Sequence, residues 1–133
     1  VALGAQGRFV LVPVPTSWRS RRERGRHLIL DVCREAEALL ARLDYEASVE
    51  PVVKLQKQTK DQSGLTARAR FANVNGAMVL AKRPSAPVVI VDDIVTTGAT
   101  LAEMKRVLLG AGVEVIGCVA IAASAHRTGR NTL

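Results

Sequence analysis

The residues best suited to chemistry lie in one short segment, where two adjacent acids precede a turn rich in threonine. Asp92 and Asp93 follow an unbroken aliphatic run, Val88–Val91, and the turn Thr96–Thr100 comes shortly after them. Because carboxylates resist removal from water, two of them at the end of a buried strand are costly unless a ligand binds them. Vicinal ribose hydroxyls or a hydrated magnesium ion would suit such a pair.

The turn Thr96–Thr100, with the sequence Thr-Thr-Gly-Ala-Thr, stands where the aliphatic strand meets a helix. Several backbone N–H groups would converge there beside the positive end of the helix dipole, a geometry that binds phosphate. Gly98 permits a close backbone approach, and threonine hydroxyls can donate to phosphate oxygens while one of them caps the helix. The same residues are also compatible with a capped strand–helix turn that binds nothing.

The spacing of apolar residues predicts the elements that must position this segment. Strands are expected at residues 8–15, 49–55, 77–80, 88–91 and 113–123, and helices at 27–44, 65–74 and 101–111. Strands that alternate with helices form parallel sheets joined by right-handed crossovers. The expected fold is therefore α/β, a three-layer Rossmann-like parallel sheet flanked by helices. Ligands of such sheets bind beyond the carboxyl ends of the strands, here the loops after Pro15, Leu55 and Asp93.

Length and charge indicate one domain that attracts anions. The chain has 133 residues and a formal net charge of +7. The positive charge is concentrated, because residues 8–34 carry seven basic and two acidic side chains and residues 54–70 carry five and one. Such patches attract nucleic acid, acidic lipid or a phosphorylated small molecule, and charge alone does not choose among them.

Composition also excludes several classes of protein. Cys33 and Cys118 are the only cysteines, so we expect neither a cysteine-built metal site nor a disulfide framework. Two free thiols indicate a reducing compartment, and we expect a cytoplasmic location. Every apolar stretch is far shorter than the ~20 residues of a membrane-spanning helix, so no membrane insertion is expected. The chain begins Val-Ala-Leu-Gly, and we expect residues 1–133 to form a single domain that lacks an N-terminal segment.

Neither GxGxxG nor GxxxxGK[ST] occurs, which excludes the common dinucleotide and nucleoside-triphosphate loops. The segment Val88–Thr100, VVIVDDIVTTGAT, instead resembles the phosphoribosyl-pyrophosphate (PRPP) signature of type I phosphoribosyltransferases. The resemblance implies that Asp92 and Asp93 are catalytic residues that contact the ribose hydroxyls and hold Mg²⁺ through those hydroxyls or water. It also implies a set of residues that bind the 5-phosphate, namely Thr96, Thr97, Gly98, Ala99 and Thr100.

Further segments resemble the ComF-like, competence-associated branch of that family. They are Val12–Pro15, the basic loop ending Arg22–Gly25, Asp61–Leu65 with Arg70 and Asn73, and Gly76–Ala77. The resemblance implies that Arg24 and Gly25 bind pyrophosphate and that a flexible loop with Lys54, Lys57 and Lys60 closes over it. Two departures are that residues 26–28 read Arg-His-Leu where many members have Phe-Asn-Gln, and that no cysteine-rich zinc module is present. The acceptor-binding hood is expected to be reduced or missing.

Two functions follow from the resemblance. The first is a transferase of nucleotide metabolism, a pentosyl glycosyltransferase that uses Mg²⁺ to move the phosphoribosyl group of PRPP to a nitrogen acceptor and release pyrophosphate. The alternative is a non-catalytic PRPP sensor or single-stranded-DNA-associated component of competence, with Arg19 and Arg21 as DNA contacts. Candidate partners are therefore PRPP, pyrophosphate, single-stranded DNA or the competence machinery, and a second copy in a homodimer.

Overall fold

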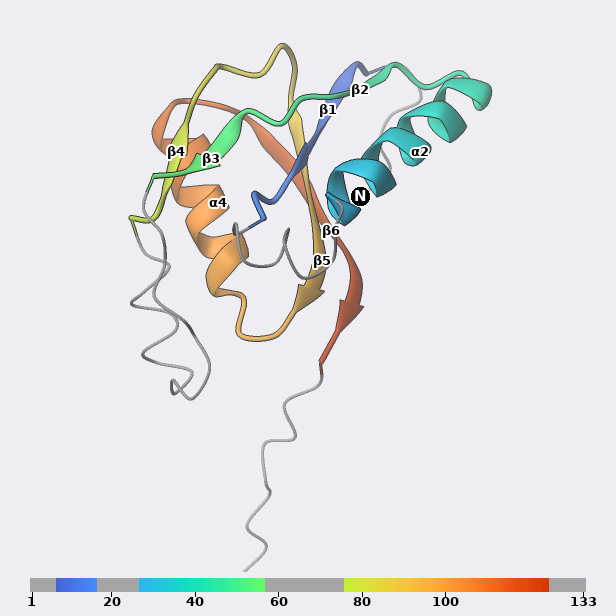
Figure 1. Cartoon of the computed structure of the whole chain (residues 1–133). Coiled ribbons are helices and arrows are strands. Elements are labelled where there is room, and N and C mark those ends of the chain that lie inside the picture. The colour runs from blue at the N-terminus through green and yellow to red at the C-terminus, as the bar shows by residue number, and fades with distance from the viewer. Residues whose placement is uncertain (1–6, 17–26, 57–75, 125–133) are drawn as a thin grey trace, which may run out of the picture.

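A computed structural model describes residues 7–16, 27–56 and 76–124 of the chain. Figure 1 shows the arrangement of the elements. In chain order they are β1 (Phe9–Pro13), α2 (Leu28–Arg42), β2 (Ala47–Val49), β3 (Val53–Leu55), β4 (Met78–Leu80), β5 (Val88–Val95), α4 (Ala99–Gly110) and β6 (Val115–Ala123).

Four strands form a parallel sheet in the order β2-β1-β5-β6. The register places Leu11 of β1 opposite Val49 on one side and Val89 on the other. Strand β5 therefore lies inside the sheet, between β1 and β6. The parallel sheet expected from the sequence is confirmed.

The strands of this sheet alternate their side chains between two apolar cores, one on each face. The first core packs strand residues against α4; its fully buried members include Val10, Val12, Val88, Ile90, Met104 and Leu108. The second packs strand residues against α2; its buried members are Phe9, Leu11, Ile29, Cys33, Val89 and Val91. Because β1 and β5 are covered on both faces, they need continuous apolar sequences, and the expected three-layer α/β architecture is confirmed.

The expected strand at residues 49–55 is wrong, because the structure divides this segment between two sheets. Strand β2 ends at Val49 and pairs with β1, whereas β3 begins at Val53 and pairs with β4 in a separate antiparallel sheet. Pro51 has no N–H to offer a ladder, and Val52 N donates instead to Glu50 O at 2.9 Å. The sequence predicts that the loop after Leu55 follows a strand of the parallel sheet. It follows β3 of the antiparallel sheet instead.

The small β3–β4 sheet lies beside α4 (Figure 1), and apolar side chains join the two. Val53 and Met78 belong to the same core as Met104 and Leu108. The helix expected at residues 65–74 lies outside the described residues. None of the helices described here is long and apolar enough to cross a membrane.

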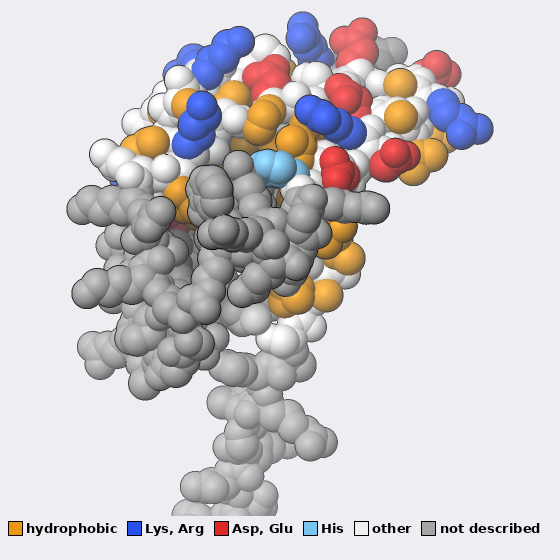
Figure 2. All heavy atoms as spheres, viewed as in Figure 1, with side chains coloured by type: hydrophobic (Ala, Val, Ile, Leu, Met, Phe, Trp, Pro, Cys, Tyr) orange, Lys and Arg blue, Asp and Glu red, His pale blue; other side chains and the backbone are white. Residues whose placement is uncertain are grey.

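One face of the molecule shows both charged and apolar side chains (Figure 2). Figure 2 shows acidic and basic side chains gathered over α2, and apolar side chains near the far end of β6. On β6, which pairs with β5 alone among the described strands, Val119 and Ile121 are both more than half exposed.

Adjacent leucines on α4 provide a matched test of the core. Leu108 is fully buried, whereas Leu109 is 57% exposed. We expect Leu108→Ala to lower the free energy of unfolding by about 2–5 kcal/mol, because it leaves a cavity against the sheet. Leu109→Ala should change it by less than about 0.5 kcal/mol. Urea denaturation of both variants measures the difference, and equal losses would contradict this placement of α4.

Candidate functional site

The candidate site lies at the carboxyl edge of the parallel sheet, around the turn that follows β5. Val14, just past β1, donates its N–H to Val91 O at 2.9 Å, and Ser124, just past β6, donates to Val95 O at 3.1 Å. These bonds place Val14 beside the middle of β5 and Ser124 beside its carboxyl end. The loop after β5 is therefore central at this edge, which is where open α/β sheets bind ligands.

The turn after β5 leads directly into helix α4, as the sequence predicts. Gly98 precedes α4 as its N-cap residue with φ of +77°, a left-handed conformation that favours glycine. Gly98 O accepts the first helical hydrogen bond, from Ala102 N at 2.9 Å, and Thr97 Oγ1 accepts from Ala99 N at 3.3 Å. The Thr97 hydroxyl thus bonds the first N–H of the helix, although the N-cap residue itself is Gly98, and Thr96 and Thr97 both precede the helix and are exposed.

The acid pair lies within β5, whereas the sequence predicted a strand that ends at Val91. The strand continues to Val95 because β6 pairs with it along this whole length, with Asp92 opposite Ala120 and Ile94 opposite Ala122. Asp92 is consequently only 5% exposed, while Asp93 is partly exposed. Each carboxylate accepts a hydrogen bond at 2.8 Å from the next N–H, Asp92 from Asp93 and Asp93 from Ile94.

Burial controls the protonation of Asp92. Removal from water raises the pKa of Asp92 to about 6; the Asp93 N–H opposes this shift, and the Asp93 carboxyl adds to it. A positive ligand or a hydroxyl donor at the pair would favour the charged form. Two carboxylates are also hard oxygen ligands, the type that Mg²⁺ prefers when substrate oxygens and water complete its shell. The residues present therefore fit a magnesium ion.

The other predicted site residues divide into two groups. Lys54 is exposed on β3, opposite Val79, and so belongs to the small antiparallel sheet rather than to the parallel one. Arg24, Gly25, Lys57 and Lys60 lie outside the described residues. The structure thus brings together the acid pair and the turn Thr96–Thr100, and the roles of the remaining residues stay predictions.

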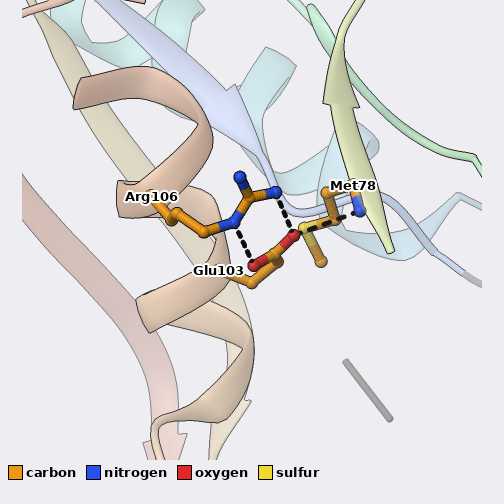
Figure 3. Close-up of polar contacts among 3 residues, drawn as sticks. All are labelled: Met78, Glu103 and Arg106. Atoms are coloured by element: carbon orange, nitrogen blue, oxygen red, sulfur yellow. Dashed lines mark hydrogen bonds and ion pairs between the residues drawn. The ribbon is translucent and has the colours of Figure 1, made fainter. Parts of the chain in front are cut away.

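The structure adds a residue that the sequence reasoning missed. Figure 3 shows Glu103, on the second turn of α4, in contact with Arg106 and with the backbone of Met78. The acid is 3% exposed, and hydrogen bonds from Arg106 are the largest cause that lowers its pKa. The sequence does contain an indication of this acid, because Glu103 lies four residues before the apolar Val107 and so falls on the apolar face of the helix.

Two comparisons place the chain among known proteins. A family model, the phosphoribosyl transferase domain, matches residues 34–132. Competence protein F of Haemophilus influenzae is 42% identical over 69 residues, which make up 49% of this chain and 30% of that protein. The chain thus matches less than a third of the length of this relative.

Gly98 and Gly110 provide a matched test of the turn. A Cβ atom at either position would meet no atom within 4 Å, but only Gly98 has a positive φ. We expect Gly98→Ala to lower the free energy of unfolding by about 1–2 kcal/mol through backbone strain. Gly110→Ala, at the end of α4, should leave stability unchanged or raise it slightly. Chemical denaturation measures both; equal effects would contradict the left-handed turn.

The pKa of Asp92 predicts a pH dependence of stability. Between about pH 6 and pH 4 the native Asp92 holds a proton that the unfolded chain has lost, so acidification stabilises the native state through this residue. We expect the wild type, relative to Asp92→Asn, to gain on the order of 1–3 kcal/mol between pH 7.5 and pH 4.5. Urea denaturation at both values tests this. A difference between the proteins that does not vary with pH would contradict the raised pKa.

Proposed function

Because this chain belongs to the phosphoribosyltransferase domain family, we propose that its segment Asp92–Thr100 binds PRPP. The 42% identity to Competence protein F confirms the expected resemblance to the ComF-like branch. One observation carries the proposal: on the central strand β5 a buried Asp92 stands next to a partly exposed Asp93, and a left-handed glycine and a helix N-terminus follow within the next turn. Few ligands need both features, and a phosphorylated ribose does.

The 5-phosphate of PRPP would occupy the turn Thr96–Thr100. Backbone N–H groups at the start of α4 and the positive end of the helix dipole favour a phosphate there. The exposed hydroxyls of Thr96 and Thr97 can donate to its oxygens. Gly98, without a side chain, leaves the backbone open to a close approach.

The ribose hydroxyls would lie against Asp92 and Asp93. Ionised carboxylates accept hydrogen bonds from vicinal hydroxyls, and the two acids would hold Mg²⁺ through those hydroxyls or through water. When bound, the ion neutralises charge on the pyrophosphate. Arg24 and Gly25, with Lys54, Lys57 and Lys60, would bind the remaining pyrophosphate oxygens, to which arginine offers forked donors.

In the proposed reaction the bond from ribose C1 to the pyrophosphate oxygen breaks. A nitrogen of the acceptor attacks C1, loses its proton to solvent and becomes bonded to the ribose, and pyrophosphate leaves with the bonding electron pair. The protein's part in such a reaction is to align the groups and stabilise the departing charge. Asp92 and Asp93 would orient the ring, while the turn Thr96–Thr100 fixes its phosphate end.

The second candidate function is a PRPP-binding component of DNA uptake without turnover. The name of the relative favours it, as does the basic segment of residues 8–34 with Arg19 and Arg21. The two functions share the PRPP site and differ in whether pyrophosphate is released. A cytoplasmic location, a homodimer and contacts to single-stranded DNA or the competence machinery belong to the proposal in either form.

Calorimetric titration with PRPP tests the proposed site. We expect magnesium-dependent binding that is tighter for PRPP than for ribose 5-phosphate, because PRPP adds the pyrophosphate contacts. The double variant Asp92→Asn, Asp93→Asn should lose at least about tenfold in PRPP affinity while it keeps its circular dichroism spectrum.

Unchanged PRPP affinity in this double variant would overturn the site assignment. If the wild type binds PRPP, a pyrophosphate-release assay with a panel of nucleobases separates the two functions. Release with any base supports the transferase, and binding without release across the panel supports the non-catalytic component.

A further inference from the structure

The two edges of the parallel sheet differ in how well they are protected from pairing with another strand. Strand β2, at one edge, has three residues, and the N–H of its last residue, Val49, donates to Glu37 Oε1 of α2 at 3.2 Å. Strand β6, at the other edge, has nine residues and pairs only with β5 in the part of the chain that the structure describes. A long edge strand presents a row of backbone N–H and C=O groups to any further strand.

The sequence of β6 lacks the residues that usually block such pairing. Residues Val115–Ala123 read VIGCVAIAA, without a charged residue or a proline, whereas natural proteins often place lysine or proline on an exposed edge. The register with β5 shifts once, near the start of β6, and the residues from Gly117 onward follow without a further shift. Val119 and Ile121 are 53% and 59% exposed, so apolar side chains stand beside this backbone. Strand β6 is therefore suited to receive another strand.

A second copy of the chain fits this edge. Two identical strands that run antiparallel about a two-fold axis present the same surface to each other, so a single self-complementary strand is sufficient. The chain has a formal net charge of +7, and two copies therefore repel each other overall. Because β6 carries no charge, two copies can meet there without bringing like charges together.

Side-chain size favours one register of the two strands. Val119 is the middle residue of β6, so a two-fold axis at Val119 pairs the strands over their full length. Gly117, Val119 and Ile121 alternate along one face of the strand. In this register Ile121 of each copy lies opposite Gly117 of the other, so that large residues face small ones, as in a well-packed core.

The area of the paired edge indicates a weak dimer. Nine residues span about 30 Å and a sheet is about 10 Å thick, so the edge covers on the order of 300 Å² per copy. Stable complexes cover roughly 800 Å² per partner, and smaller interfaces belong to reversible, concentration-dependent association.

We propose that β6 pairs antiparallel with β6 of a second copy about a two-fold axis at Val119, which joins the two four-stranded sheets into one. This inference rests on the proposed function only in that a homodimer belongs to it. No residue of β6 belongs to the proposed PRPP site.

Sedimentation of the full chain at increasing protein concentration tests the dimer. We expect the average mass to rise from 14.2 kDa toward twice that value, with a dissociation constant in the micromolar range. Val119→Lys places two lysines opposite each other and should weaken the dimer about tenfold or more. Leu39→Lys is the matched control, because it makes a similar change at a side chain on α2 that is 57% exposed. It should dimerise like the wild type, and circular dichroism checks that both variants are folded.

A disulfide between the copies tests the register. We expect Val119→Cys, in a Cys118→Ser background, to form a covalent dimer on mild oxidation, because directly opposite Cβ atoms lie about 5 Å apart, close to the separation that a disulfide bridges. Leu39→Cys in the same background should stay monomeric. Cys33 does not interfere, since it is fully buried and burial raises the pKa of its thiol to about 11.

A wild type that stays monomeric at high micromolar concentration would overturn this dimer, and so would equal losses for Val119→Lys and Leu39→Lys. Titration of the same sample with PRPP keeps the two proposals apart. A monomer that binds PRPP overturns the β6 interface alone, whereas a dimer that binds no PRPP overturns the PRPP site and leaves the interface standing.

Discussion

The burial of β5 is the constraint on which the remainder of this structure depends. The strand has neighbours on both sides in the sheet and a helix over each face, and Val88 and Ile90 are completely removed from solvent. Two apolar cores therefore fix the position of this strand, and the strand in turn places the segment that follows it. The turn Thr96–Thr100 and the start of α4 follow a strand whose first half is fixed in this way, and a site needs such support if it is to hold a ligand in one geometry.

The strand and the turn after it carry two unusual features, of which the buried Asp92 opposes stability. Asp92 is held in a nearly buried place where its charge is unfavourable, and Gly98 occupies a conformation that other residues rarely adopt. Departures of this kind persist only where the surrounding structure fixes them, and they gather at functional sites. The two apolar cores beside β5 provide that support.

The segment Val88–Thr100 could be predicted from the sequence because each local signal agrees with the next: an aliphatic run, a turn with glycine and an amphipathic helix. The length of β5 could not be predicted, because two adjacent acids are typical of the end of a buried strand. The strand continues to Val95 only because it pairs with β6. The division of residues 49–55 was missed because the apolar pattern runs across Pro51 without a break. Glu103 was missed because its role depends on β4, an element distant in the sequence. The ligand contacts of the site residues stay predictions, because side-chain geometry alone does not identify a ligand.

Two buried carboxylates in this chain show opposite shifts of pKa, and the contrast bears on function. Glu103 has a guanidinium beside it, and its pKa is lowered. Asp92 has another acid beside it, and its pKa is raised. A carboxylate whose charge is neutralised within the fold needs no ligand to stabilise its ionised form. A carboxylate whose charge is disfavoured is stabilised in its ionised form by a bound cation or by hydroxyl donors. Asp92 lies at the carboxyl edge of the sheet, close to the turn at the N-terminus of α4. Such a ligand would therefore contact Asp92 and the turn at the same time. The electrostatics of the two acids therefore favour Asp92 as a ligand-binding group and Glu103 as a fixed part of its support.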